Sequence, residues 1–191
     1  MIKRSLIFLF LMLACGCSGA KSPKNNIDIK GKWKSNAPEQ AGEGAFVERQ
    51  FRFLDSLWQI DYTLYMDKEL QKPVFQFQGE GSYSIEEPSA KIKGAFNGTF
   101  KMSKKYITLL TDDKGAIKNY GFDIYKLDKG QKFDISETGC YFIAPVNECD
   151  KEYDIIKTDG SVLYFGKRPP DNDISKPENR PTSLGLPLVK Y

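Results

Sequence analysis

The sequence has no histidine among its 191 residues. Without histidine the chain can form neither a Ser–His or Cys–His nucleophile pair nor a histidine-ligated zinc site. Its 28 basic residues nearly balance its 25 acidic ones, so the charge gives no reason to expect nucleic acid as a partner. The sequence also lacks a phosphate-binding loop, a dinucleotide fingerprint and a Gly-x-Ser-x-Gly elbow. These absences exclude the commonest kinds of catalytic site.

Cysteine is scarce, with four residues in the chain. Two of them, Cys140 and Cys149, lie outside the N-terminal apolar segment. In an oxidising compartment such a pair is expected to form a disulfide, worth about 2.5 kcal/mol on the chain-entropy model for so short a loop. The alternative is a reactive thiol, although no histidine is available as its base.

A long apolar run occurs only at the N-terminus. Lys3 and Arg4 precede an unbroken apolar run at residues 6–14, and small residues and cysteines follow at once. This order is typical of a secretory signal, and the run is too short to span a bilayer as a permanent helix. A plain secretory signal is one interpretation of this segment.

The end of that segment, Leu13-Ala14-Cys15-Gly16-Cys17-Ser18, resembles a bacterial lipoprotein signal. Cys17 is the favoured lipidated residue, and Cys15 is the alternative. We therefore expect a protein of the cell envelope, lipid-anchored to a membrane, because several acyl chains give stable anchoring. Ser18 stands where some bacteria use aspartate for inner-membrane retention, so the outer membrane or cell surface is favoured. The predicted parts are a signal peptide at 1–16, a tether at 17–29 and one domain at 30–191.

Period-two alternation dominates the domain. Trp58, Ile60, Tyr62, Leu64 and Met66 alternate with mostly polar neighbours, and a turn at residues 55–56 separates them from a similar run at 45–54. This pattern predicts an antiparallel hairpin with one buried face.

Other segments continue the alternation, at residues 92–102 and again at 106–111, and residues 112–119 predict one short helical turn. Glycines between aromatics at 92–102 suit a curved wall. The sequence thus predicts an all-β fold: an antiparallel, lipocalin-like β-barrel, closed or half-open, of about 8–10 strands. Five prolines in the last 25 residues predict an irregular strap over the barrel, without a regular strand for most of its length.

The predicted inner face carries the candidate binding residues. The chain has 13 Phe, 10 Tyr and 2 Trp, and an apolar interior with one arginine suits a lipid or another long apolar ligand. Alternatively, Arg49 pairs with a buried carboxylate such as Asp61 or Glu80, and the aromatic side chains fill the barrel. The candidate ligand contacts are Arg49, Trp58, Tyr62, Phe96 and Phe100.

Metal and acid–base chemistry have little support in the sequence. The acidic stretch at 171–178 fails the calcium-loop spacing, because Lys176 stands where glycine is needed. Glu86 and Glu87 are adjacent, so on a strand they face opposite ways. We therefore expect no metal, no cofactor and no enzymatic activity. An enzyme that uses carboxylates alone is the weakest of the hypotheses.

Several short motifs resemble the domain of the adenomatosis polyposis coli down-regulated protein family. They are Phe46-Val47-Glu48-Arg49-Gln50-Phe51-Arg52-Phe53, Tyr65-Met66-Asp67, Pro73-Val74-Phe75 and Gly81-Ser82-Tyr83, and a tail from Asp159 to Thr182 that looks like bacterial members. The resemblance implies a lipocalin-like, half-open barrel that binds lipid. The animal relatives are membrane-tethered Wnt antagonists. This chain has one domain and has Ser35 to Glu39 where the animal pattern has a cysteine, so the Wnt role is not carried over.

Two functions from different classes follow as expectations. The first is non-enzymatic binding of a lipid or another apolar small molecule by a membrane-anchored envelope lipoprotein. The second is an envelope interaction or structural lipoprotein with a filled barrel and a protein partner. An open apolar cavity would favour the first function, and a filled barrel with an exposed apolar patch would favour the second.

Overall fold

The computed structural model describes residues 27–191, and these form one antiparallel β-structure with a short helix. The predicted signal peptide and lipidation site lie outside the described residues. Ile27 and Ile29, at the end of the predicted tether, pack against the core. The elements are β1 (Gly31–Ser35), β2 (Glu39–Gly42), β3 (Ala45–Phe53), β4 (Leu57–Tyr65), β5 (Pro73–Pro88), β6 (Phe96–Leu109), α1 (Lys114–Asn119), β7 (Lys132–Asp134), β8 (Lys151–Thr158), β9 (Val162–Gly166), a 3-10 turn (Pro177–Asn179) and β10 (Leu184–Lys190).

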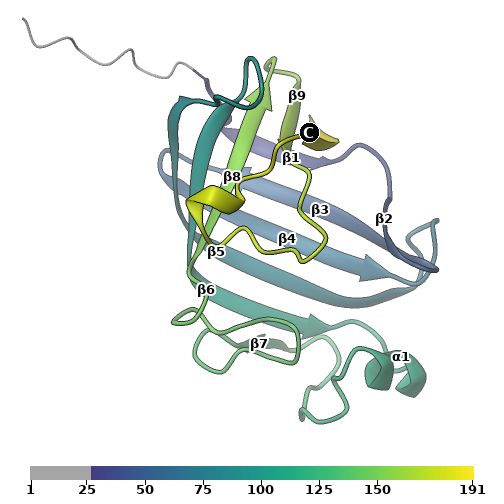
Figure 1. Ribbon diagram of the computed structural model, residues 1–191. Helices are drawn as coiled ribbons and strands as arrows, with labels where there is room; N and C mark the ends of the chain where they lie inside the picture. The colour runs from purple at the N-terminus through teal and green to yellow at the C-terminus, as the bar shows by residue number, and fades with distance from the viewer. Residues whose placement is uncertain (1–26) are drawn as a thin grey trace, which may run out of the picture.

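Eight strands close a barrel in the order β1-β10-β9-β8-β6-β5-β4-β3, with β3 pairing back to β1 (Figure 1). The predicted all-β, lipocalin-like barrel is therefore confirmed. The predicted hairpin is also present as β3 and β4, which pair from Phe46↔Tyr65 to Phe53↔Trp58. The short helix forms where expected, with Asp113 as its N-cap.

The barrel has two unlike halves. In the closed half, β1 pairs with residues 50–53 of β3 and β8 pairs with residues 96–101 of β6. In the other half, β2 pairs with residues 45–47 of β3 and β7 with residues 106–108 of β6. Within the described chain β2 and β7 have no other strand partner, so they are the two edges of an open half.

The prediction of two separate strands in the region of β6 was wrong. The two segments expected at 92–102 and 106–111 form a single strand, Phe96–Leu109, interrupted by a bulge at Ser103. The bulge shifts the alternation by one residue, so Met102 faces inward before it and Lys105 after it. It also explains Gly81 on β5, because a Cβ there would lie 1.9 Å from the Lys101 carbonyl oxygen.

The C-terminal segment is partly irregular, as expected, but it ends in a strand. Residues 167–183 cross the outside of the barrel, where the guanidinium of Arg180 donates to the carbonyls of Gly98 (2.6 Å) and Asp154 (2.7 Å) and pairs with Glu86 (2.6 Å). The chain then enters the barrel as β10, between β9 and β1. The prediction missed this strand because of Pro187, which β10 accommodates beside an irregularity in its pairing with β9.

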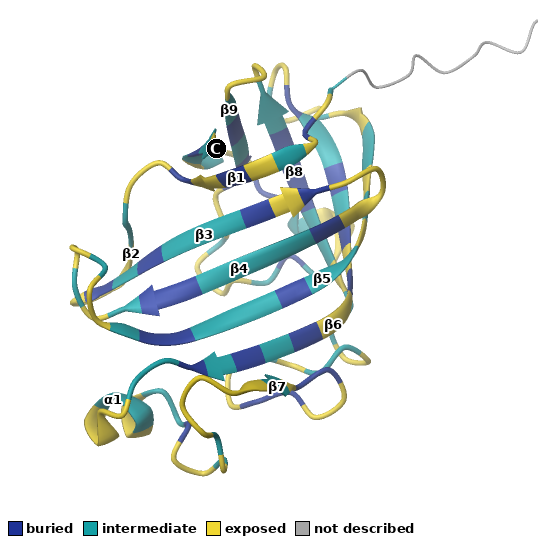
Figure 2. Cartoon of the chain, turned by 180° about the vertical axis from the view of Figure 1, so that it is seen from behind, coloured by how far each residue is buried: buried dark blue, intermediate teal, exposed yellow. Residues whose placement is uncertain are grey.

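The closed half is filled by side chains. Trp33 is fully buried and donates its indole N–H to the Ile29 carbonyl at 2.7 Å. Around it the rings of Phe51, Phe53, Phe100 and Phe165 pack with centroids 4.6–6.4 Å apart. Figure 2 shows the alternation of buried and less buried residues along the barrel strands that produces this packing. This aromatic plug closes one end of the barrel, so a ligand site must be sought in the open half.

Candidate functional site

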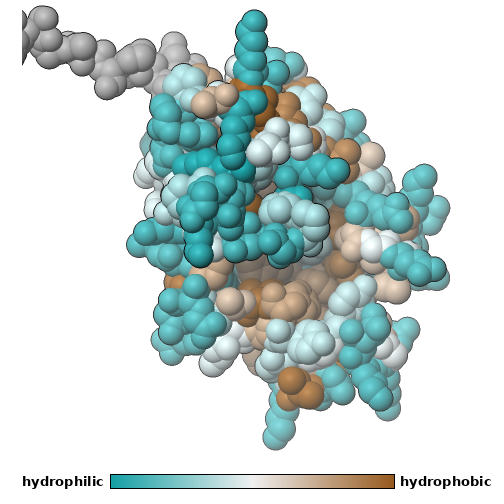
Figure 3. Space-filling view, in the orientation of Figure 1, coloured by the Kyte–Doolittle hydropathy of each residue, from teal (hydrophilic) through white to brown (hydrophobic). Residues whose placement is uncertain are grey.

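The inner wall of the open half is mostly apolar. It belongs to a second core cluster that includes Val47, Leu64, Phe75 and Ile107, with Tyr62 and Phe77 partly buried against it. Figure 3 shows a hollow on this face, between the segment 167–183 and the β7–α1 region, with apolar side chains at its floor. The open half is therefore the concave, apolar part of the barrel.

Arg49 lies on the inner face of β3, beside the aromatic plug. Its Nε donates to Oε1 of Glu39 at 2.9 Å, and the two side chains are 19% and 16% exposed. The Ser35 hydroxyl donates to the same carboxylate at 2.6 Å and accepts the Arg49 backbone N–H at 2.9 Å. Arg49 therefore faces inward as predicted, but its partner is Glu39 on β2. The suggested partners Asp61 and Glu80 were wrong, because both alternate with inward-facing neighbours on their strands.

A second charged group lies on β8 and the segment after β9. Glu152 and Asp154 share the face of β8 that carries buried Ile156, and Arg168 pairs with Glu152. Asp154 is buried, and its carboxylate accepts the backbone N–H groups of Ile155 (2.7 Å) and Gly166 (2.8 Å). Burial raises the pKa of Asp154 to about 6 despite the nearby Arg168.

Tyr62 packs against the apolar cluster of the open half and is the cross-strand neighbour of Arg49. Burial raises the pKa of its hydroxyl to about 12, and the charges of Glu39 and Arg49 on one side and Arg168 on the other also act on it. The phenol is therefore neutral across the physiological range.

Lys105 holds the long segment between β7 and β8 against the barrel. Its side chain is buried, and its ammonium donates to the carbonyls of Ala144 (2.7 Å) and Cys149 (2.8 Å). Burial lowers its pKa. Because the ammonium already donates to backbone carbonyls, Lys105 holds residues 136–149 against the barrel. It is therefore not available as a free cation in the hollow.

The predicted disulfide is not formed, since Cys140 and Cys149 are both free thiols. Cys140 is packed in the open-half cluster, and its backbone forms an isolated antiparallel β-bridge with that of Ile143. Burial raises its thiol pKa to about 11, so the thiol is protonated at neutral pH. Cys149 lies instead beside Lys105, which its carbonyl contacts.

The structure separates the five predicted ligand contacts. Arg49 and Tyr62 lie in the open half. Trp58 and Phe100, 4% and 2% exposed, are in the plug, where their rings meet at 5.1 Å. Phe96 is the half-buried first residue of β6, paired with Pro88 and Ile156 in the closed half.

Sequence reasoning missed several residues of the hollow. The missed residues are Glu39, Phe75, Phe77, Lys105, Glu152, Asp154 and Arg168. One signal could have found two of them, because Glu152 and Asp154 alternate in step with the apolar Ile156. Lys105 gave no such signal, since the bulge at Ser103 reverses the phase of β6.

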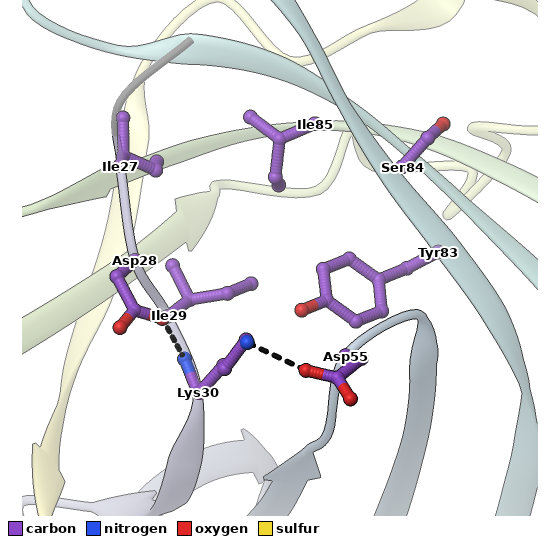
Figure 4. Close-up of a pocket in the computed structure, with 8 residues that line it drawn as sticks. All are labelled: Ile27, Asp28, Ile29, Lys30, Asp55, Tyr83, Ser84 and Ile85. Atoms are coloured by element: carbon purple, nitrogen blue, oxygen red, sulfur yellow. Dashed lines mark hydrogen bonds and ion pairs between the residues drawn. The ribbon is translucent and has the colours of Figure 1, made fainter. Parts of the chain in front are cut away.

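A pocket of about 450 Å³ lies at the closed end, where the chain enters β1 (Figure 4). Its apolar wall includes Ile27, Ile85 and Tyr83, and an exposed ion pair between Lys30 and Asp55 (2.6 Å) crosses it. It contains none of the five predicted contacts. We assign the candidate site to the open half, because a partly buried arginine, Arg49, lies there beside an apolar wall.

The family model of Adenomatosis polyposis coli down-regulated 1 matches residues 18–118. The chain belongs to this family. The match to the Adenomatosis polyposis coli down-regulated 1 model covers just over half of the chain and includes Glu39, Arg49 and Tyr62. The β8 wall and Arg168 lie beyond it. Among residues 27–191, no helix is long and apolar enough to cross a membrane.

Proposed function

We propose that the protein binds a lipid or another long apolar molecule in the open half of its barrel, without catalysing a reaction. We further propose that it acts as an envelope lipoprotein anchored through Cys17. The observation that carries the proposal is Arg49, a partly exposed interior arginine at the boundary between the aromatic plug and an apolar wall. Such a site suits an amphipathic molecule whose polar end meets the arginine.

The shape of the barrel supports this proposal. The closed half is packed, so an apolar chain has no space there. The open half has a concave apolar floor and unpaired strand edges at β2 and β7, which leave a way in from the side. The family membership supports the barrel but by itself says nothing of a ligand.

Native mass spectrometry of the protein, gently purified from envelope membranes, tests the proposal. We expect a co-purifying lipid that is lost in Arg49→Gln, with an affinity about 10–100-fold lower because one charge-assisted hydrogen bond is removed. Arg52→Gln is the matched control, since Arg52 lies on the same strand but is exposed on its outer face. A protein that stays empty when challenged with envelope extract would contradict lipid binding.

One observation favours an interaction role as the second candidate. Tyr141, Phe142 and Ile124 are 73%, 49% and 72% exposed on the segment that flanks the open half. The Phe142 ring also contacts Phe75 and Phe122 of the core cluster, at 5.5 and 5.9 Å. Exposed apolar surface of this kind suits a protein partner. An empty barrel together with loss of an envelope complex in Tyr141→Ser would favour this function.

A further inference from the structure

The charges that face the hollow are balanced. Arg49 pairs with Glu39 on one wall, and Arg168 pairs with Glu152 on the other. Lys105 is already held by backbone carbonyls, and the Asp154 carboxylate accepts two backbone N–H groups. Arg49–Glu39 and Arg168–Glu152 are therefore the two ion pairs among these groups, and Arg168 itself is exposed.

The Arg49–Glu39 pair is the less exposed of the two. Its side chains are 19% and 16% exposed, against 38% and 22% for Arg168 and Glu152. Both groups lie beside the plug, since the Arg49 guanidinium is 5.8 Å from the centre of the Phe51 ring. At this depth, water compensates a separated charge poorly.

A ligand with a single charge would leave this pair unbalanced. Only Nε of Arg49 donates to Glu39, so an anionic head group can bind the remaining guanidinium N–H groups, but it then lies beside the Glu39 carboxylate. A cationic head group on Glu39 likewise lies beside the Arg49 guanidinium. Like charges held together in a partly buried site repel each other. A ligand that carries both charges can bind both members and leave the pair balanced.

We propose that the ligand is zwitterionic, with a phosphate or carboxylate that binds Arg49 and an amine or quaternary ammonium that binds Glu39. This proposal rests on the proposed function, because it names the head group of the ligand bound in the same hollow. The apolar chain then lies along the wall formed by Tyr62, Phe75 and Phe77.

Ligands that share one chain length and differ only in their head group test this proposal. The full-length, delipidated protein is titrated by calorimetry with monomeric lysophosphatidylcholine, lysophosphatidylglycerol and an alkyltrimethylammonium salt. We expect the zwitterion to bind at least about tenfold more tightly than either singly charged ligand. Equal affinities, or a tighter anion, would overturn the zwitterion proposal and leave lipid binding intact. Failure of all three to bind would instead contradict the proposed function itself.

Two variants supply a second, independent readout. Glu39→Gln should shift the preference toward the anionic ligand, and Arg49→Gln should shift it toward the cationic one. Glu48→Gln and Arg52→Gln, on the outer face of the same strand, are controls that should leave the preference unchanged. If both interior variants weaken all three ligands equally, the pair is only structural and the proposal is wrong. If either variant fails to fold, the wild-type comparison still decides.

Discussion

The carboxyl group of Asp154 is buried, and burial disfavours its ionised form. Its folded-state pKa is raised to about 6 by burial, above the ordinary value of 3.8. A raised carboxyl pKa means that ionisation weakens the fold. The protein therefore has no penalty from Asp154 below about pH 4, loses stability as the pH rises from about 4 to about 6, and bears the full penalty above that.

Asp154→Asn should remove this pH dependence. The amide oxygen can still accept from Ile155 and Gly166, and the variant should gain on the order of 3 kcal/mol relative to wild type between pH 4 and pH 7. Urea unfolding across that range measures the difference.

The control for this measurement is Asp134→Asn. A hydrogen bond from Lys104 lowers the pKa of Asp134 to about 2, so its stabilising effect is lost below pH 4. The unfolding free energy of the Asp134→Asn variant, plotted against pH, should therefore run parallel to that of wild type from pH 4 to pH 7. An Asp154→Asn curve that is also parallel to wild type would contradict the cost of ionising Asp154.

The strand pair β5–β6 depends on one glycine. A Cβ at Gly81 would lie 1.9 Å from the Lys101 carbonyl oxygen, because the bulge at Ser103 brings the backbones together. Gly81→Ala should destabilise the fold by roughly 3 kcal/mol or more, measured by denaturant unfolding.

Gly79, two residues earlier on β5, is the matched comparison. A Cβ there would meet only side-chain atoms, at 3.3–3.4 Å from Ile60, Phe77 and Met102. Small side-chain shifts can relieve such contacts, so Gly79→Ala should cost clearly less than Gly81→Ala. Equal losses in the two variants would show that the bulge does not determine the requirement for glycine.

The same bulge shows where period-two alternation stops predicting strand boundaries and inward-facing residues. The β3–β4 hairpin has no bulge, so its period-two pattern predicted the boundaries to within one residue and the inward face of Arg49 correctly. On β6 an extra residue reverses the phase, so one strand looked like two and the pattern gave no sign that Lys105 faces inward. An insertion of this kind depends on the partner strand, which a local pattern does not contain.

At the scale of the molecule, the sequence could predict a barrel but not how its two halves differ. Strong aromatic alternation indicated one continuous apolar interior with an arginine in it. The partner of that arginine could not be predicted, because Glu39 lies in a short strand whose sequence resembles a loop. The sequence left open whether aromatic side chains fill the barrel, since the filling of the closed half depends on Phe165 and Phe51 meeting from strands far apart in the chain.

The two halves should also differ in how they open. The closed half has strands paired on both sides around an aromatic plug, whereas β2 and β7 are short and paired on one side only. Backbone amides of β9 and of residues 50–53 should therefore exchange with deuterium only on global unfolding. Those of β2, β7 and α1 should exchange at least about 100-fold faster, through local opening.

Hydrogen–deuterium exchange with and without a bound amphiphile connects this difference to function. A ligand that occupies the hollow contacts Glu39, so it should slow exchange in β2 while β9 stays unchanged. Denaturant dependence is the control, because only the global openings should respond steeply to urea. Uniform protection across both halves would contradict the division of the barrel. Slowing confined to β9 would place the ligand in the closed half, where the plug leaves it no space.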